Sequence, residues 1–278
     1  MQFGLSTREI SSHIRGAAKV AVLVYLAIYT AVYIWAPFSE DWNNIVTNLF
    51  LVVASSFAAM IATLVWDHFE RGEVARGVWF YFAIGLWLWA VAEQIWGFLN
   101  IAQGEVPEGV SDIFWVAAYI FFAAALLRQY SILVQPNKQE LWKRILLGIL
   151  LLFVLYIPLF YVLSSTEADS QDWFGPIVNS FYPVADLLLG GIAIWLVRHF
   201  RGGAFSRPWL GLLAFCITDL LYAWIEISGN YAWSVNANDL LTALFDIAYL
   251  GAYLILGLGL LSQWVFLKYG MRSSSSEE

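Results

Sequence analysis

Six carboxylic acids stand inside long apolar stretches of this sequence, where charged side chains are rare. They are Glu93, Asp112, Asp186, Asp219, Glu226 and Asp246, and Asp239 stands just before the last stretch. No lysine or arginine lies in the middle of these stretches to neutralise them. A charge at the centre of a bilayer costs about 2.5–3.5 kcal/mol on insertion scales, and intramembrane acids are usually functional. The pattern favours a binding site for a cation, an amine or a proton. Hydrogen bonding between helices is the alternative interpretation.

Aromatic residues accompany the first of these acids. Trp89, Glu93 and Trp96 recur at helical spacing and therefore share one face of a helix. Aromatic rings beside a carboxylate suit an organic cation, although packing of this face against the stretch 111–134 explains the same spacing. The hydrogen-bond partners expected for the acids are tryptophan and tyrosine side chains and the amides Gln94, Asn100, Asn179, Asn236 and Asn238.

The composition restricts the class of protein. Of the 278 residues, 61% are hydrophobic and 13% are charged, whereas soluble domains carry about 25% charged residues. The net charge of −7 argues against nucleic-acid binding, and the single cysteine excludes a disulfide framework or a cysteine-based zinc cluster. The histidines His13, His68 and His199 stand far from the acids, and no catalytic or nucleotide-binding motif occurs. We expect no metal, no cofactor and no enzyme, and leave open only an intramembrane enzyme that uses carboxylates and tyrosines.

Eight apolar windows are long enough to cross a membrane as helices, which takes about 20 residues. They cover residues 17–36, 44–66, 77–99, 111–134, 143–164, 176–197, 208–228 and 240–266. Pro158 and Pro183 fall inside two windows, where proline can kink a helix. The first window has no small-residue cleavage site and predicts a signal anchor. The sequence therefore predicts an all-α integral membrane protein with eight transmembrane helices.

The basic residues predict the orientation of these helices. With the N-terminus inside, all 14 lysines and arginines lie on the cytoplasmic side. The opposite loops carry no lysine or arginine. Their acidic residues include Glu40, Asp41, Glu105, Glu108, Glu167, Asp169 and Asp172. Because the lysine and arginine bias sets topology, both termini are predicted to be cytoplasmic. The six acids then lie between the midplane and the outer surface, with Asp186 and Asp219 deepest.

Short matches about 130 residues apart predict an internal duplication. Trp79 matches Trp209, and Ala118-Tyr119 matches Ala248-Tyr249. Glu93 aligns with Asp219 only if the spacing shortens by a few residues. An even number of crossings per unit makes such repeats parallel. The predicted parts are a cytoplasmic N-terminal segment (residues 1–16), a first four-helix repeat (17–134), a cytoplasmic linker (135–142), a second four-helix repeat (143–268) and a disordered cytoplasmic tail (269–278).

Several of these segments resemble a known family. Arg76-Gly-Val-Trp79, Ala92-Glu-Gln-Ile-Trp96, Ser111-Asp112, Tyr182-Pro-Val-Ala-Asp186 and Thr218-Asp-Leu-Leu-Tyr222 are similar to the duplicated multi-helix membrane sensor region found ahead of GGDEF, EAL or histidine-kinase domains in bacteria and archaea. The resemblance covers about residues 17–266 and implies a sensory module in the cytoplasmic membrane of such a cell. It places Glu93, Asp112, Asp186 and Asp219 at the family's recurring acids. Since no output domain follows residue 270, it implies a separate cytoplasmic or membrane output protein.

We therefore expect a stand-alone sensory or ligand-binding module, embedded in membrane lipids, with an acidic and aromatic cavity open to the outer side. Its candidate ligand-binding residues are the six acids together with Trp89 and Trp96, and its ligand is a small molecule or cation. A small cation- or proton-coupled transporter is the second hypothesis, supported by Asp186 and Asp219 near the midplane. A structural subunit of a larger membrane complex is the third.

Overall fold

The chain folds into a bundle of long helices. The computed structural model describes residues 7–103, 109–135, 137–166, 174–227 and 240–270. In this part the helices are α1 (Thr7–Trp35), α2 (Glu40–His68), α3 (Val74–Gln103), α4 (Val110–Val134), α5 (Lys138–Thr166), α6 (Phe174–His199), α7 (Arg207–Ile227) and α8 (Leu240–Val265), which a short π-helix, η1 (Phe266–Gly270), extends. All eight α-helices are long and apolar enough to cross a membrane. The prediction of an all-α protein with eight membrane-spanning helices is thus confirmed at the level of the helices.

Most helices extend beyond the apolar windows that predict them. α1 begins at Thr7 and α3 ends at Gln103, because a helix that satisfies its own backbone hydrogen bonds continues into the polar region of a bilayer. α5 and α6 run without interruption through Pro158 and Pro183. Acidic residues occupy the first turn of α2 and basic residues the last turn of α6, where each sign suits the helix dipole.

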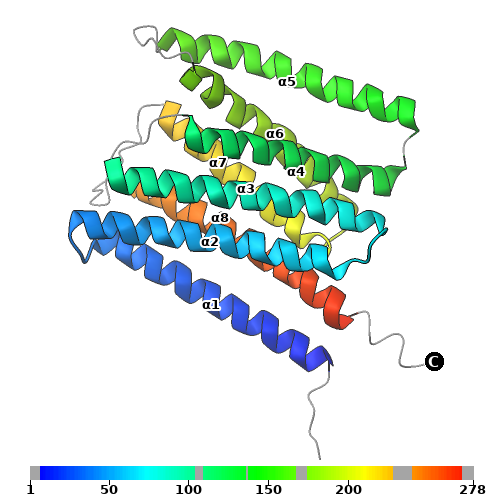
Figure 1. Cartoon of the computed structure of the whole chain (residues 1–278), viewed down its shortest axis with the longest axis horizontal. Coiled ribbons are helices and arrows are strands. Elements are labelled where there is room, and N and C mark those ends of the chain that lie inside the picture. Colours follow the sequence, from blue (N-terminus) through cyan, green and yellow to red (C-terminus); the bar gives the residue numbers. More distant parts are fainter. Residues whose placement is uncertain (1–6, 104–108, 136, 167–173, 228–239, 271–278) are drawn as a thin grey trace, which may run out of the picture.

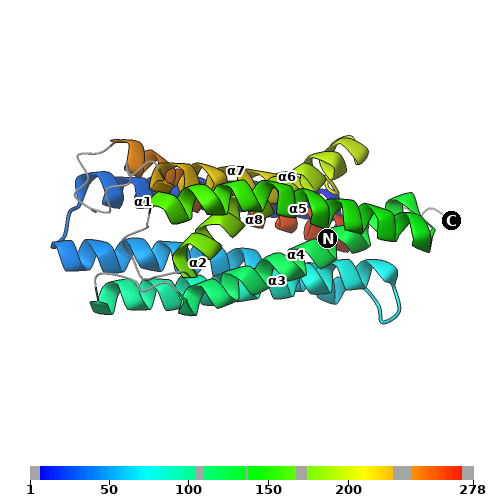
Figure 2. The same cartoon turned by 90° about the horizontal axis from the view of Figure 1, so that it is seen from above.

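Neighbouring helices in the sequence are mostly neighbours in space. α3 packs against α2 and α4, and α7 packs against α6 and α8. Two further contacts join distant parts of the chain, since α2 packs on α8 and α6 packs on α4. α1 lies against α8, whereas α5 packs on α6 alone among its larger contacts, so that α1 and α5 form opposite edges of the bundle (Figure 1). Seen from above, the helices run along one common direction (Figure 2).

Small residues set the closest helix contacts. The buried face of α2 carries Ala54, Ala58 and Ala62, which let α3 and α8 approach it. A Cβ atom added to Gly211 of α7 would lie 2.5 Å from the Cα atom of Leu256 in α8. α7 and α8 therefore cross here at a distance that only glycine permits.

Aromatic side chains bridge α3 and α7 in the centre of the bundle. The indole rings of Trp79 and Trp209 are stacked, with their centroids 5.5 Å apart. Further along the same two helices, Trp89 meets Phe215 edge to face at 4.7 Å. By contrast, Leu163 is the one buried residue among the described side chains of α5, so this helix presents nearly all of its side chains to the surroundings of the bundle.

Candidate functional site

The structure places five of the six predicted acids on the inner faces of the helices. Glu93, Asp112, Asp186 and Asp246 are buried, and Asp219 is half-buried. The side chain of Glu226 and the whole of Asp239 lie outside the described residues. The five acids come from α3, α4, α6, α7 and α8, and all of them are hydrogen-bonded, mainly by tyrosines of other helices.

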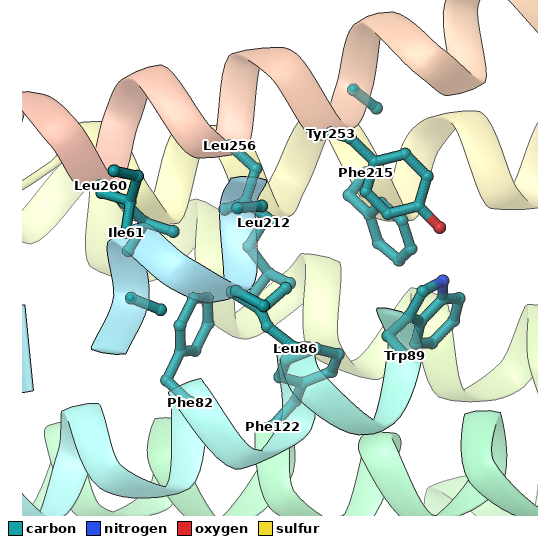
Figure 3. Packing of buried hydrophobic residues seen from close by; sticks show 14 of the residues in the cluster. Ile61, Phe82, Leu86, Trp89, Phe122, Leu212, Phe215, Tyr253, Leu256 and Leu260 are labelled. Atoms are coloured by element: carbon teal, nitrogen blue, oxygen red, sulfur yellow. The ribbon is translucent and has the colours of Figure 1, made fainter. Parts of the chain in front are cut away.

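Glu93 of α3 accepts three hydrogen bonds on a single oxygen. The donors to its Oε1 atom are Tyr253 Oη at 2.6 Å, Tyr249 Oη at 2.9 Å and Trp89 Nε1 at 3.2 Å. Both tyrosines belong to α8 and are four residues apart, a spacing that puts them on one helix face. Trp89 precedes Glu93 by one helical turn. Figure 3 shows the indole of Trp89 and the ring of Tyr253 turning their polar atoms toward each other. Three donors around one oxygen suit an ionised carboxylate.

Asp186 of α6 and Asp219 of α7 share one tyrosine. The Oη atom of Tyr119 in α4 lies 2.8 Å from Oδ1 of Asp186 and 2.9 Å from Oδ2 of Asp219. The two carboxyl groups also interact with each other, and the thiol of Cys216 lies against Asp186. Asp186 is 1% exposed, yet its Oδ2 atom has no hydrogen-bond partner. This pair therefore has far fewer donors than Glu93.

Asp246 of α8 forms a third group with two tyrosines. Tyr33 of α1 donates to its Oδ2 atom, and Tyr222 of α7 donates to Oδ1 at 2.5 Å. Through these bonds the carboxylate connects α1 to the α7–α8 pair. The ring of Tyr222 lies 5.4 Å from that of Tyr249, so this group adjoins the Glu93 group.

Asp112 has a structural position at the start of α4. Its Oδ2 atom accepts the backbone N–H of Gly109 at 2.8 Å, and its Oδ1 atom accepts the hydroxyl of Tyr182 of α6 at 2.6 Å. Gly109 has a φ of +127°, which only glycine adopts readily. A carboxylate in the first turn that binds the preceding backbone N–H stabilises the helix start. These contacts account for Asp112 without any ligand.

The predicted tryptophans differ in their surroundings. Trp89 is buried against Trp115, Tyr119 and Phe122 of α4, so the packing interpretation of this face is confirmed for Trp89. Its N–H group nevertheless contacts Glu93, which makes it part of the site as well. Trp96 is half-buried. The Nε1 atom of Trp115, beside Trp89, is buried and has no hydrogen-bond partner.

The acids form one connected region, which we define as Glu93, Asp186, Asp219 and Asp246 with their tyrosines. We call it the outer acid cluster, after the side of the membrane that the sequence predicts for it. Glu93 and Asp219 interact electrostatically, and Phe215 packs between the Trp89 and Tyr253 rings. None of the hydrogen bonds to Glu93, Asp186 or Asp219 comes from a lysine or arginine, and the ion pair found within the described residues joins Arg144 to Glu140 at the start of α5.

The same described residues contain no group of three or more histidine, cysteine, aspartate and glutamate side chains that could hold a metal ion.

Part of the outer acid cluster is only partly buried in the bundle. Asp219, Tyr222 and Tyr249 lie on the inner faces of α7 and α8, yet each is only half-buried. Deeper on the same face of α7, Leu212 and Phe215 are 0% and 3% exposed. Exposure along this face therefore rises from Phe215 to Asp219 and Tyr222, toward the end of the helix that the sequence assigns to the outer side.

The tyrosine donors are the main feature that the sequence did not single out by residue. Of the predicted amide partners, Gln94 is exposed, Asn179 is half-buried, and Asn100 contacts Asn48 at 3.4 Å. Asn236 and Asn238 lie outside the described residues. The four-residue spacing of Tyr249 and Tyr253 in an apolar helix was the available signal. No family model matches the chain, and no curated protein or solved structure is significantly similar to it.

Proposed function

We propose that this chain is an integral membrane sensory module that binds a small cation from the outer side at its outer acid cluster. The single observation that carries the proposal is the Asp186–Tyr119–Asp219 group, in which two buried or half-buried carboxyl groups share one donor and have no basic partner. Buried charges are stable only when paired or fully hydrogen-bonded. A cation is the partner that this group lacks.

The internal duplication explains how occupation of this group would affect the whole molecule. In the proposed repeats, α1–α4 correspond to α5–α8. The contact between α2 and α8 is then the counterpart of the contact between α6 and α4. The matched residues Trp79 and Trp209 stack on each other. Tyr119 of the first repeat reaches Asp219 of the second, and Tyr249 of the second reaches Glu93 of the first. The acid cluster is thus built from exchanged contacts between the repeats.

The proposed mechanism follows from these exchanged contacts. Binding of a cation changes the charge between α6 and α7 and with it the hydrogen bond that Tyr119 of α4 makes. Since α4 and α6 belong to different repeats, their relative packing shifts. The shift is read at the cytoplasmic ends of the helices by a separate output protein in the cell membrane or cytoplasm of a bacterium or archaeon. Both termini lie in the cytoplasm, as the distribution of basic residues favours.

The test measures tryptophan fluorescence of the full chain in lipid nanodiscs, because Trp89 adjoins the cluster. Sodium chloride, tetramethylammonium chloride or acid is added at constant ionic strength. We expect at least one of these cations to change the emission, and we expect Asp219→Asn to abolish the change. Glu70→Gln is the matched control, because Glu70 is exposed between α2 and α3. A response to none of the three, or an unaltered response in Asp219→Asn, contradicts the proposal.

A transporter would use the same acids, so flux is measured in parallel. Asp186 and Asp219 bridge the two proposed repeats, which is where parallel-repeat carriers bind their substrates. Proteoliposomes are loaded with a pH-sensitive dye and given a sodium or proton gradient. The sensory proposal predicts no flux above that of empty liposomes. Entry of protons or sodium ions that is abolished in Asp219→Asn would contradict the sensory proposal and support the transporter hypothesis.

A further inference from the structure

We propose that the cation held by Asp186 and Asp219 is a proton, shared between the two carboxyl groups and exchangeable with the outer aqueous phase. The inference rests on the proposed function and specifies the chemistry of its site. It depends on two independent features: the number of hydrogen atoms available for the observed contacts, and a buried oxygen of Asp186 that no donor reaches.

The hydrogen count comes from Tyr119. A phenol hydroxyl carries one hydrogen atom and can donate one hydrogen bond. Its oxygen, however, lies at hydrogen-bonding distance from both carboxyl groups, at 2.8 Å and 2.9 Å. An ionised carboxylate only accepts hydrogen bonds. The second contact is therefore a hydrogen bond only if the carboxyl group that makes it is protonated and donates to the tyrosine oxygen.

The second feature is the Oδ2 atom of Asp186. It is buried and has no hydrogen-bond partner, and its residue is 1% exposed. A charged oxygen in this position would have lost its hydration with nothing in return. Burial of an unpartnered oxygen costs much less in a neutral carboxyl group, because only the charged form loses strong hydration. One proton on the pair accounts for both features.

The surroundings favour a proton over a larger cation. Calcium and magnesium ions take six or more oxygen ligands. Beside the two carboxyl groups, the described neighbours offer only the Tyr119 hydroxyl and the Cys216 thiol. One turn beyond Asp186, a Cβ atom on Gly190 would already be in van der Waals contact with Cys216, at 3.5 Å. α6 and α7 are therefore packed closely beside the pair.

The helices packed against α6 and α7 carry several titratable groups. Tyr119 belongs to α4, and Tyr182 of α6 itself bonds Asp112. Glu93 of α3 and Tyr249 of α8 interact with Asp219. Tyr156 of α5 stacks on Phe160. All of these groups are acids or phenols, so no neighbour among them supplies a positive charge in place of the proton.

The exchange step conserves charge and atoms. When the outer solution becomes more alkaline, the O–H bond of the shared carboxylic acid breaks and the proton leaves to water beside half-buried Asp219. The protonated carboxyl group thereby becomes ionised, as its partner already is. Repulsion between the two charges then separates α6 from α7, and Tyr119 can donate to only one of them. Acidification reverses the step.

Infrared spectroscopy of the full chain in nanodiscs tests this inference, because protonated and ionised carboxyl groups absorb at separate frequencies. At about pH 7, where an ordinary aspartate is ionised, we expect a band of a protonated carboxyl group in the wild-type protein. Asp186→Asn and Asp219→Asn should each remove the band, because the remaining aspartate accepts from the new amide. Glu70→Gln should keep it. Absence of the band from the wild type, or its persistence in both asparagine variants, overturns the inference.

The two proposals fail in different ways. A fluorescence response to sodium or tetramethylammonium without a protonated band would overturn the proton but keep cation binding. A protonated band that both aspartates need, with no fluorescence response to any cation or to pH, would keep the shared proton and overturn the sensory function. The infrared spectrum of the wild type needs no substitution, so the inference can be tested even if a variant fails to fold.

Discussion

Glu93 and the Asp186–Asp219 pair are neighbouring acidic sites that differ in how many hydrogen-bond donors their buried carboxyl groups receive. Glu93 directs one oxygen at three donors from α3 and α8. The aspartate pair has a single phenol for two carboxyl groups. Hydrogen bonds from neutral donors can hold a charge in place, so Glu93 needs no ligand. The pair lacks such donors, and we therefore propose it as the responsive part of the outer acid cluster.

The largest loss of stability is expected when the hydrogen-bond donors to the Glu93 carboxylate are removed. Replacing Tyr249 and Tyr253 together by phenylalanine leaves Glu93 with only Trp89 as donor. Each hydrogen bond to a charged group contributes about 1.5–3 kcal/mol, so the free energy of unfolding should fall by about 3–6 kcal/mol. Titration with SDS, followed by circular dichroism in mild detergent, measures it. A loss below about 1 kcal/mol would mean that Glu93 is not ionised and does not differ in charge from a protonated aspartate.

A substitution in the scaffold separates packing from the acids. In Gly211→Ala the new methyl group meets the backbone of Leu256, and such overpacking costs about 1–3 kcal/mol. Gly191→Ala in α6 is the matched control, because nothing lies within 4 Å of its Cβ position. We expect Gly211→Ala to lower the midpoint of SDS unfolding and the control to leave it unchanged. Equal midpoints would show that α7 and α8 do not cross as closely as described.

The donor shared by the aspartates should matter less than the donors of Glu93. In Tyr119→Phe the proton on the pair can still join the two carboxyl groups, so we expect a loss of about 0.5–1.5 kcal/mol, typical of a hydrogen bond between neutral groups. The single variant Tyr253→Phe, measured beside it by the same SDS titration, should lose about twice as much. The reverse order would indicate that the charge resides on the aspartate pair.

The smallest effect is expected at Asp112. Asparagine keeps one carbonyl oxygen for the N–H of Gly109, so Asp112→Asn should cost less than about 1 kcal/mol. The protonated band and the fluorescence response should be those of the wild type, because Asp112 serves the start of α4. A variant that loses either signal would add Asp112 to the ligand-binding residues.

The helices could be predicted from the sequence because the bilayer dictates their length and apolar composition. The window 111–134 and helix Val110–Val134 nearly coincide. The first helix begins about ten residues before its window, at Thr7, because residues such as Glu9 and Ser12 are polar yet compatible with a helix. Apolar windows locate the part of a helix that crosses the hydrocarbon, and they carry no information on how far it extends beyond.

The acids of the site could be predicted, but their partners could not. A carboxyl group in an apolar stretch is conspicuous in any sequence, and depth along a helix follows from counting residues. Which tyrosine faces Asp219 depends on the rotation of α4 and α7 and on the contact of α6 with α4, which joins distant parts of the chain. The alignment of Glu93 with Asp219 shows that matched acids in the sequence need not lie at the same depth. Glu93 follows Trp79 by 14 residues and Asp219 follows Trp209 by 10, so the two acids differ by about one helical turn in depth.

Isotope labelling of the two kinds of acid tests the central contrast most directly. The protein is produced once with carboxyl-¹³C aspartate and once with carboxyl-¹³C glutamate, and the infrared band of the protonated carboxyl group is recorded at about pH 7 for each. The shared proton on Asp186 and Asp219 predicts that the band shifts with labelled aspartate and stays in place with labelled glutamate. A band that shifts with labelled glutamate would assign the proton to a glutamate such as Glu93 and contradict a proton shared by Asp186 and Asp219.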